Sequence, residues 1–288
     1  MPKADINKKV FRIPGYILIT GRILQFISKE LAAHFAMKLF RSPFRFERPS
    51  REESRYRRFH KSFLQIPDMG KKIRIYSGNE GKKRKKVLLV HGWAGRGTQM
   101  YALADNLEQA GYTVYSFDAP AHGDSGGKTT AMPEFINCIL EINENYGPFD
   151  YAIGHSLGGM SLLAALNRGL RLQRLVVIAG GNSIYKITHR FIRRLGLREE
   201  TADVLYRLMS RKLRTDPVTL SADTNAAGIR IPVLVIHDRD DNDVPVSCAE
   251  EVFRALPDGS LHLTQGLGHR RILSDPDVID TVLRFINT

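Results

Sequence analysis

The chain has 288 residues, of which 43 are Lys or Arg, 30 are Asp or Glu, and 43% are hydrophobic. This length and apolar content fit one large α/β domain and exclude a wholly disordered chain. The two cysteines, Cys138 and Cys248, exclude a disulfide scaffold and a cysteine-rich zinc module. Both lie in predicted helices, which indicates buried thiols.

The positive charge is concentrated in the first third of the chain. Residues 1–86 carry a net charge of +16, whereas residues 87–288 carry −3. A basic segment of this kind favours contact with an anionic surface, either a phospholipid bilayer or a nucleic acid. No nucleic-acid-binding motif accompanies the charges, so we do not expect nucleic acid as a partner.

An apolar stripe predicts an amphipathic helix within a basic N-terminal extension, residues 1–61. Large apolar side chains recur every four residues and stop before Pro43: Ile23, Ile27, Leu31, Phe35 and Leu39. Two interpretations stay open. Either the stripe packs on the rest of the protein, or it rests on an anionic membrane as an interfacial helix.

The N-terminus does not match a cleavable targeting signal. Lys8, Lys9 and Arg12 precede a short apolar run at residues 16–19, but Arg22 follows it and no small-residue cleavage site is present. No stretch reaches the roughly 18 apolar residues of a spanning helix. We therefore expect a cytoplasmic protein, with any membrane contact peripheral and at the inner face.

From residue 62 onward, predicted strands and helices alternate, and residues 62–288 form the predicted α/β domain. The strands are 62–66, 71–76, 87–90, 113–117, 151–154, 175–179, 233–236 and 261–264, and the helices are 98–110, 132–145, 157–167, 247–256 and 276–286. This order predicts a mostly parallel sheet with helices on both faces. Ligands of such sheets bind at the carboxyl ends of the strands.

Residues 181–230 interrupt the alternation. They are helix-like and basic in their first part, and the interruption is too long for a plain connection. We interpret the segment as a small helical cap over the strand ends. Such a cap would shape a substrate pocket and exclude water from it.

A candidate nucleophile lies at a predicted strand-to-helix turn. The residues Gly154, His155, Ser156, Leu157 and Gly158 match the pattern G-x-S-x-G in that context. The glycines leave room for a sharp turn that projects the serine hydroxyl at the end of the strand. The helix N-terminus points partial positive charge toward it.

A serine nucleophile needs a base and a carboxylate that orients the base. His269 follows the last predicted strand, in a glycine-containing loop that can bring the imidazole over the strand ends. The acid is expected between the serine and the histidine in chain order, after a strand. Four candidates lie there: Asp238, Asp240, Asp241 and Asp243.

Over residues 62–288 these features resemble the α/β-hydrolase superfamily, in particular serine esterases and lipases with a small helical cap. The family's His-Gly-x-x-Asp-x-x-Val-Pro pattern implies Asp241 as the acid, because Val244 and Pro245 stand at the expected offset. Asp238 replaces the usual glycine of that pattern. Asp240 and Asp243 stay open as alternatives.

The resemblance also implies an oxyanion hole. His91 and Gly92 begin a loop that is similar to the family's His-Gly-x-x-Gly loop. In the family, the backbone N–H after the His-Gly pair and the N–H after the nucleophile bind the oxyanion, which implies Trp93 and Leu157 here. His91, Gly92, Gly154 and Gly158 then support the site. His122 lies in a segment similar to the family's Asp-x-Pro-Gly-His-Gly-x-Ser loop and is interpreted as structural.

The sequence therefore predicts a serine hydrolase that cleaves carboxylic esters through an acyl-enzyme. It needs no cofactor or metal and acts on a small-molecule ester, or on lipid-like substrates at a membrane surface. Two alternatives stay open. One is a binding module on the same fold with weak or no catalysis, because fold alone does not fix function. The other is an acyltransferase, thioesterase or peptidase that uses the same triad.

Overall fold

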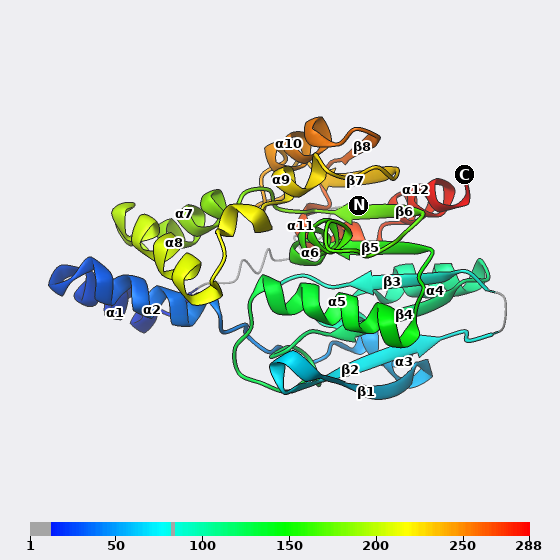
Figure 1. The fold of residues 1–288 in the computed structure, drawn as a ribbon, viewed down its shortest axis with the longest axis horizontal. Helices are drawn as coiled ribbons and strands as arrows, with labels where there is room; N and C mark the ends of the chain where they lie inside the picture. The colour runs from blue at the N-terminus through cyan, green and yellow to red at the C-terminus, as the bar shows by residue number, and fades with distance from the viewer. Residues whose placement is uncertain (1–12, 82–83) are drawn as a thin grey trace, which may run out of the picture.

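The computed structural model describes residues 13–81 and 84–288. Within this part of the chain a single eight-stranded sheet forms the centre of the protein (Figure 1). Lys8, Lys9 and Arg12, which precede the apolar run at residues 16–19, lie outside the described residues.

The sheet is mostly parallel, as predicted. Its spatial order is β1-β2-β4-β3-β5-β6-β7-β8, with antiparallel pairing from β1 to β4 and parallel pairing from β4 to β8. In chain order the strands are β1 (His60–Ile66), β2 (Lys71–Gly78), β3 (Lys86–Val90), β4 (Thr113–Asp118), β5 (Tyr151–His155), β6 (Arg174–Ile178), β7 (Val233–Asp238) and β8 (Gly259–Thr264). β4, β5 and β7 are buried along their whole length, because helices cover both of their faces.

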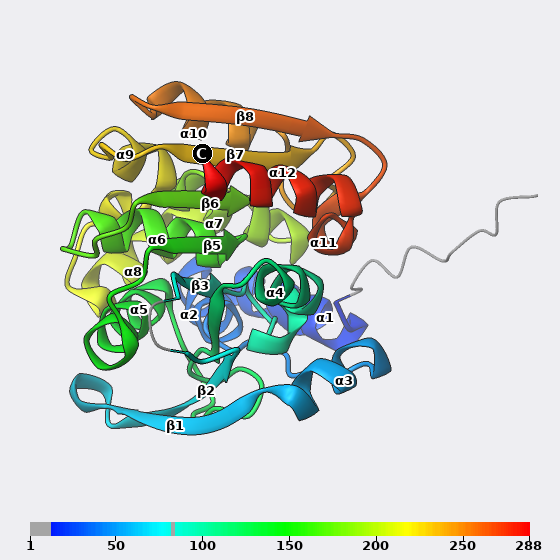
Figure 2. The ribbon, with the colours of Figure 1, turned by 90° about the vertical axis from the view of Figure 1, so that its right-hand side faces the viewer.

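Helices cover both faces of the sheet (Figure 2). One face carries α3 (Ser50–Arg58), α4 (Tyr101–Gln109) and α12 (Pro276–Asn287). The other carries α5 (Met132–Tyr146), α6 (Leu157–Leu166), α9 (Ala222–Ala226) and α10 (Ser247–Ala255). Every predicted strand is present, with boundaries within two residues of those expected. The predicted helix at residues 98–110 differs by more, because a 3-10 turn at Gly97–Met100 takes the place of its first turn and α4 begins at Tyr101. Cys138 in α5 and Cys248 in α10 are buried free thiols.

Residues 181–230 contain α7 (Ile184–Arg194), α8 (Glu200–Leu213) and α9. In Figure 1, α7 and α8 project beyond the strands and lie beside α1 (Gly15–Ile27) and α2 (Lys29–Phe40). α2 packs on α8, and the Gln25 side chain at the end of α1 accepts a hydrogen bond from Arg198 N at 2.8 Å. The division into an extension at 1–61 and a domain at 62–288 remains a prediction.

The prediction of a single N-terminal helix from the apolar stripe is wrong, because the structure has two helices, α1 and α2. Ser28 adopts an extended conformation that ends α1, and its hydroxyl caps α2 by accepting from Glu30 N at 3.1 Å. Ile23, Ile27 and Leu31 are exposed. The buried face of α2 instead consists of small residues and a methionine: Ala32, Ala33, Ala36 and Met37. Small side chains allow α2 to approach α8 closely, whereas the bulky stripe does not fit that contact.

Several basic residues before β1 are engaged within the protein. Arg55 is buried and pairs with Asp105 at 2.9 Å and with Glu108. Arg45 donates hydrogen bonds to the carbonyls of Ala121 and Ser125 at 3.1 and 2.6 Å. These contacts fasten residues 45–58 to α4 and to the loop after β4. They also leave fewer free cations in this run for a nucleic acid.

No helix in residues 13–81 or 84–288 combines the length and the apolar character needed to cross a bilayer.

Candidate active site

Ser156 occupies a strained turn between β5 and α6. Its φ of 53° and ψ of −119° are unusual for a residue with a side chain, and such strain costs about 1–3 kcal/mol. The neighbouring glycines make the turn possible. A Cβ on Gly154 would lie 2.5 Å from Gly159 Cα, and a Cβ on Gly158 would lie 2.2 Å from the Val90 carbonyl oxygen. The turn therefore holds the Ser156 side chain at the carboxyl end of β5.

Asp241 and His269 form a hydrogen-bonded pair. The His269 Nδ1 to Asp241 Oδ2 distance is 2.7 Å, and the Asp241 side chain is buried. The other carboxylate oxygen, Oδ1, accepts from Asp243 N at 2.8 Å and Val244 N at 2.9 Å. Burial works to raise the pKa of Asp241. The hydrogen bond and charge of His269, together with the two backbone donors, outweigh burial and lower that pKa.

The other aspartates of this segment are placed differently. Asp240 Oδ2 accepts from Gly266 N at 3.0 Å, and Asp243 lies 3.4 Å from the Arg194 guanidinium. The structure thus brings Asp241, and neither Asp240 nor Asp243, to the His269 ring.

Asp238 anchors the loop that carries His269, a function that the sequence did not reveal. Its buried carboxylate accepts from Gly268 N at 2.9 Å, Leu267 N at 3.0 Å and Thr264 Oγ1 at 2.7 Å. Burial opposes ionisation, but these donors outweigh it, so the pKa of Asp238 lies below its usual value. The sequence signal that could have indicated this role is that Asp238 stands where the family pattern usually has a glycine.

His155 fixes the backbone of His269. Its Nε2–H donates to the His269 carbonyl oxygen, with an N···O distance of 2.8 Å, and the two rings lie 4.7 Å apart. Burial, reinforced by the nearby His269, lowers the pKa of His155 to about 3. His155 is therefore neutral at pH 7 and acts as a hydrogen-bond donor through Nε2. No pattern in the sequence indicates this role.

Two backbone amides close to the serine turn have no hydrogen-bond partner within the described residues. In the described part of the chain, neither Trp93 N nor Leu157 N has a hydrogen-bond acceptor. Leu157 N is the first amide of α6, where the helix dipole is positive. The loop after β3 approaches closely, because a Cβ on Gly92 would lie 2.8 Å from Ser156 Cβ. Both amides therefore remain available to bind an oxyanion.

His91 and His122 hold this loop in place. His91 Nε2 accepts from Ala119 N at 3.0 Å, which leaves Nδ1–H to donate to Gly92 O at 2.7 Å. His122 Nε2 accepts from Ala94 N at 3.0 Å. Burial lowers the pKa of His122 to about 4 and places that of His91 well below its ordinary value. Both rings are neutral at pH 7 and link loops, which agrees with the structural role expected for His122.

Ser156, Leu157, His269 and Trp93 line one cavity of about 940 Å³. Charged side chains also line the cavity, among them Glu47, Arg96 and Arg270. Many of its apolar lining residues come from the N-terminal helices and from residues 181–230: Ile17, Met37, Leu39, Phe40, Ile184, Ile187, Phe191, Leu195, Met209 and Leu213. Phe40 joins the two groups, because its ring packs edge-on against Phe191 with a centroid separation of 5.1 Å. Among the described residues no hydrogen bond joins Ser156 Oγ to His269, a contact that often tightens only when substrate binds.

Comparison with known proteins identifies relatives that are hydrolases. A 2-hydroxy-6-oxononadienedioate/2-hydroxy-6-oxononatrienedioate hydrolase of Escherichia coli O139:H28 is 24% identical, covering 72% of this chain and 88% of that protein. A pimeloyl-[acyl-carrier protein] methyl ester esterase of Nitrosomonas europaea is 27% identical, covering 66% and 91%.

Solved structures share the fold. The Pyrococcus furiosus esterase Pf2001 superimposes with a TM-score of 0.64 at 20% identity, over 85% of this chain and 96% of that one. The Exiguobacterium antarcticum esterase EaEST gives a TM-score of 0.61 at 16% identity, over 80% and 100%. The sequence profile of the alpha/beta hydrolase family matches residues 87–281, which is more than half of the chain. With its mostly parallel sheet and strand-to-helix serine turn, the chain belongs to the α/β hydrolase family.

Proposed function

We propose that the protein is a serine hydrolase of carboxylic esters, with Ser156 as nucleophile, His269 as base and Asp241 as the acid that orients the base. The observation that carries the proposal is the 2.7 Å contact between His269 and Asp241, made in the cavity that Ser156 also lines. A positioned base beside a strained strand-end serine is the arrangement that activates a hydroxyl for acyl transfer.

In the acylation step, Ser156 Oγ attacks the ester carbonyl carbon and its proton passes to His269 Nε2. Asp241 holds Nδ1–H and stabilises the imidazolium that forms. The carbonyl oxygen becomes an oxyanion that accepts hydrogen bonds from Trp93 N and Leu157 N, each worth about 3 kcal/mol. The intermediate then collapses. The alcohol leaves with the proton from His269 Nε2, and the acyl group remains on Ser156.

Water completes the cycle through the same residues. His269 Nε2 removes a proton from a water molecule, whose oxygen attacks the acyl carbonyl. Collapse of the second intermediate expels Ser156 Oγ, which recovers its proton from His269. The products are a carboxylic acid and the free enzyme.

The apolar cavity favours esters with a long acyl chain. For p-nitrophenyl esters from acetate to palmitate, we expect kcat/KM to rise by up to about fourfold per methylene until the cavity is full, because a buried CH₂ contributes ~0.8 kcal/mol. Steady-state kinetics of the purified full chain measures this. An optimum at acetate would contradict an acyl-binding role for the cavity.

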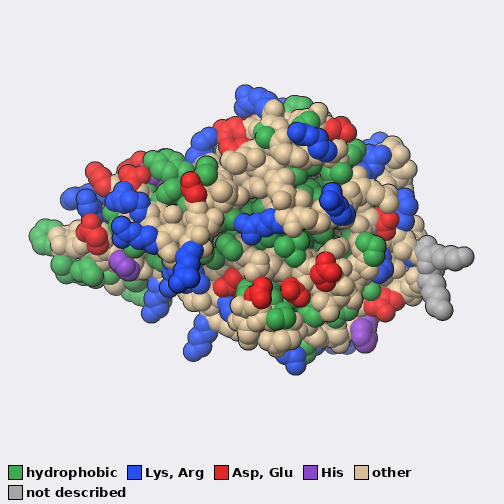
Figure 3. Space-filling model, viewed as in Figure 1, with side chains coloured by type: hydrophobic (Ala, Val, Ile, Leu, Met, Phe, Trp, Pro, Cys, Tyr) green, Lys and Arg blue, Asp and Glu red, His purple; other side chains and the backbone are tan. Residues whose placement is uncertain are grey.

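We further propose that α1 rests on an anionic membrane surface. One face of this helix exposes large apolar side chains, with Phe26 at 92% exposure: Tyr16, Ile19, Ile23, Phe26 and Ile27. In Figure 3, hydrophobic side chains gather at the left end of the molecule, where α1 lies, and both basic and acidic side chains lie beside them. An exposed apolar helix face fits the acyl-chain boundary of a bilayer, and the neighbouring Lys and Arg side chains can contact anionic headgroups.

Membrane binding is expected to depend on this face. The triple variant Ile23→Ser/Phe26→Ser/Ile27→Ser should bind vesicles of phosphatidylglycerol and phosphatidylcholine at least about 100-fold more weakly, because three apolar side chains no longer enter the interface. Co-sedimentation measures the binding. Hydrolysis of soluble esters should stay within about twofold, since none of the three residues lines the cavity.

A matched control changes an exposed apolar residue elsewhere. Phe63 in β1 is 42% exposed, and Phe63→Ser should leave vesicle binding unchanged. The membrane proposal fails if the triple variant binds like the wild type, or if the wild type does not bind.

A further inference from the structure

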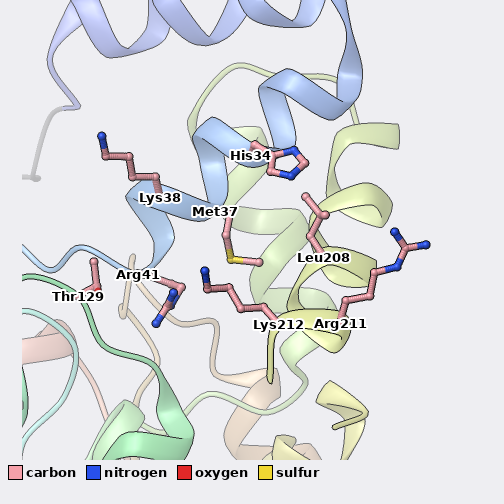
Figure 4. A pocket seen from close by; sticks show the side chains of 8 residues that line it. All are labelled: His34, Met37, Lys38, Arg41, Thr129, Leu208, Arg211 and Lys212. Carbon is pink, nitrogen blue, oxygen red and sulfur yellow. The ribbon is translucent and has the colours of Figure 1, made fainter. Parts of the chain in front are cut away.

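A second cavity, of about 470 Å³, lies between α2 and α8 and is lined by cations (Figure 4). Lys38 and Arg41 come from the end of α2, and Arg211 and Lys212 come from the end of α8. No acidic side chain lines it. In Figure 4, Lys212 extends toward Arg41 beneath Met37, whereas Lys38 and Arg211 extend outward.

Three of the four cations have no ion-pair partner in the described ranges: Lys38, Arg211 and Lys212. Arg41 pairs with Glu134 at 4.0 Å, and its Nε is buried without a hydrogen-bond partner in that part of the chain. Arg41 and Lys212 point toward each other at the cavity, and Lys38 and Arg211 add positive charge at its rim, which favours an anionic ligand.

The cationic cavity adjoins the large cavity that holds Ser156. Met37, Arg41 and Lys212 line both. A molecule that bridges these neighbouring cavities would place an anionic group among the cations and an apolar chain with its ester in the large cavity. A phosphate matches this lining, because a guanidinium and ammonium groups bind its oxygens through charge-assisted hydrogen bonds.

We propose that the cavity between α2 and α8 binds the phosphate of an amphiphilic ester of the lysophospholipid type, whose acyl chain enters the large cavity. This proposal rests on the proposed ester hydrolysis at Ser156. The exposed apolar face of α1, which packs beside α2, favours a lipid over a soluble phosphate ester. An acidic acyl-carrier protein is the competing ligand for such a surface, and the experiment below separates it.

Binding is measured first, by titration calorimetry on full-length Ser156→Ala protein, so that no turnover interferes. The ligands are two non-hydrolysable ether lipids, 1-hexadecyl lysophosphatidic acid and 1-hexadecylglycerol, together with glycerol 3-phosphate and an acidic acyl-carrier protein. We expect the phosphate-bearing lipid to bind roughly 10- to 100-fold more tightly than the neutral lipid. Adding Arg211→Gln/Lys212→Gln should abolish that difference.

The charge-matched control is Arg168→Gln/Arg171→Gln, which alters two exposed arginines in the loop between α6 and β6, at the amino-terminal end of β6. It should preserve the preference for the phosphate-bearing lipid. Equal binding of both lipids overturns the proposal, and so does glycerol 3-phosphate binding as tightly as the lipid. It is also overturned if Arg211→Gln/Lys212→Gln weakens only the binding of an acidic acyl-carrier protein.

Activity then links the site to the reaction. With Ser156 restored, Arg211→Gln/Lys212→Gln should lower the ratio of kcat/KM for 1-palmitoyl lysophosphatidic acid to kcat/KM for 1-palmitoylglycerol roughly 10- to 100-fold. An equal loss on both substrates would contradict a phosphate site. If the wild type binds the lipids as expected but hydrolyses neither, the proposed function fails and the anion site stands.

Discussion

Replacing Ser156 with alanine is expected to lower kcat for ester hydrolysis by roughly 10⁴- to 10⁶-fold, because the reaction loses its nucleophile and the acyl-enzyme cannot form. The fold should persist. Ser156 Oγ makes no hydrogen bond in the described part of the chain, and alanine keeps the Cβ in the same strained turn. The free energy of unfolding should therefore change by less than about 0.5 kcal/mol.

Steady-state kinetics and urea unfolding measure the two quantities on the same preparation. Ser247→Ala is the matched control, since Ser247 is exposed at the start of α10 and lies outside the cavity. It should leave both quantities unchanged. If Ser156→Ala keeps more than about a hundredth of wild-type kcat, the nucleophile is another group and the mechanism is wrong.

Replacing Asp241 with asparagine should lower kcat by about 10³- to 10⁴-fold through the histidine tautomer. The Asp241 Oδ1 atom accepts from two backbone amides, so the carboxamide oxygen of asparagine should take that place. Its NH₂ group would then face His269 Nδ1 and donate to it. Nδ1 must give up its proton, Nε2 carries one instead, and His269 cannot accept the proton of Ser156.

The neighbouring aspartates serve as controls for this substitution. Asp240→Asn and Asp243→Asn change exposed carboxylates that contact Gly266 N and Arg194, respectively, so each should lower kcat by less than about tenfold. The three variants are compared by kcat on one soluble ester. A loss in Asp240→Asn or Asp243→Asn as large as that in Asp241→Asn would contradict the assignment of the acid.

The strands and the serine turn could be predicted because their signals are local. Strands buried on both faces appear as short apolar runs, and residues 87–90 show this pattern. The positive φ at Ser156 requires flanking glycines, which the sequence displays at 154 and 158. The resemblance to the α/β-hydrolase pattern implied Asp241 through its offset to Val244, and the Val244 amide donates to the Asp241 carboxylate.

Other features depend on residues far apart in the chain, so sequence patterns could not reveal them. Arg55 looks solvent-exposed within a basic run, yet it is buried because Asp105 and Glu108, about fifty positions later, neutralise it. Asp238 anchors the histidine loop because β7 pairs with β8, which brings the amides of Leu267 and Gly268 within reach of its carboxylate. The period-four stripe put Ile23 on the same face as Phe35, but the Ser28 cap divides that helix in two.

The central claim is that His269 and Asp241 activate Ser156. The most direct measurement is labelling of the intact protein with a fluorophosphonate, followed by mass spectrometry of the peptides, for the wild type and for Asp241→Asn. We predict rapid, stoichiometric labelling of the wild type at Ser156 and labelling slowed by orders of magnitude in Asp241→Asn. Labelling at another residue, no labelling of the wild type, or equal rates in the two proteins would contradict the account.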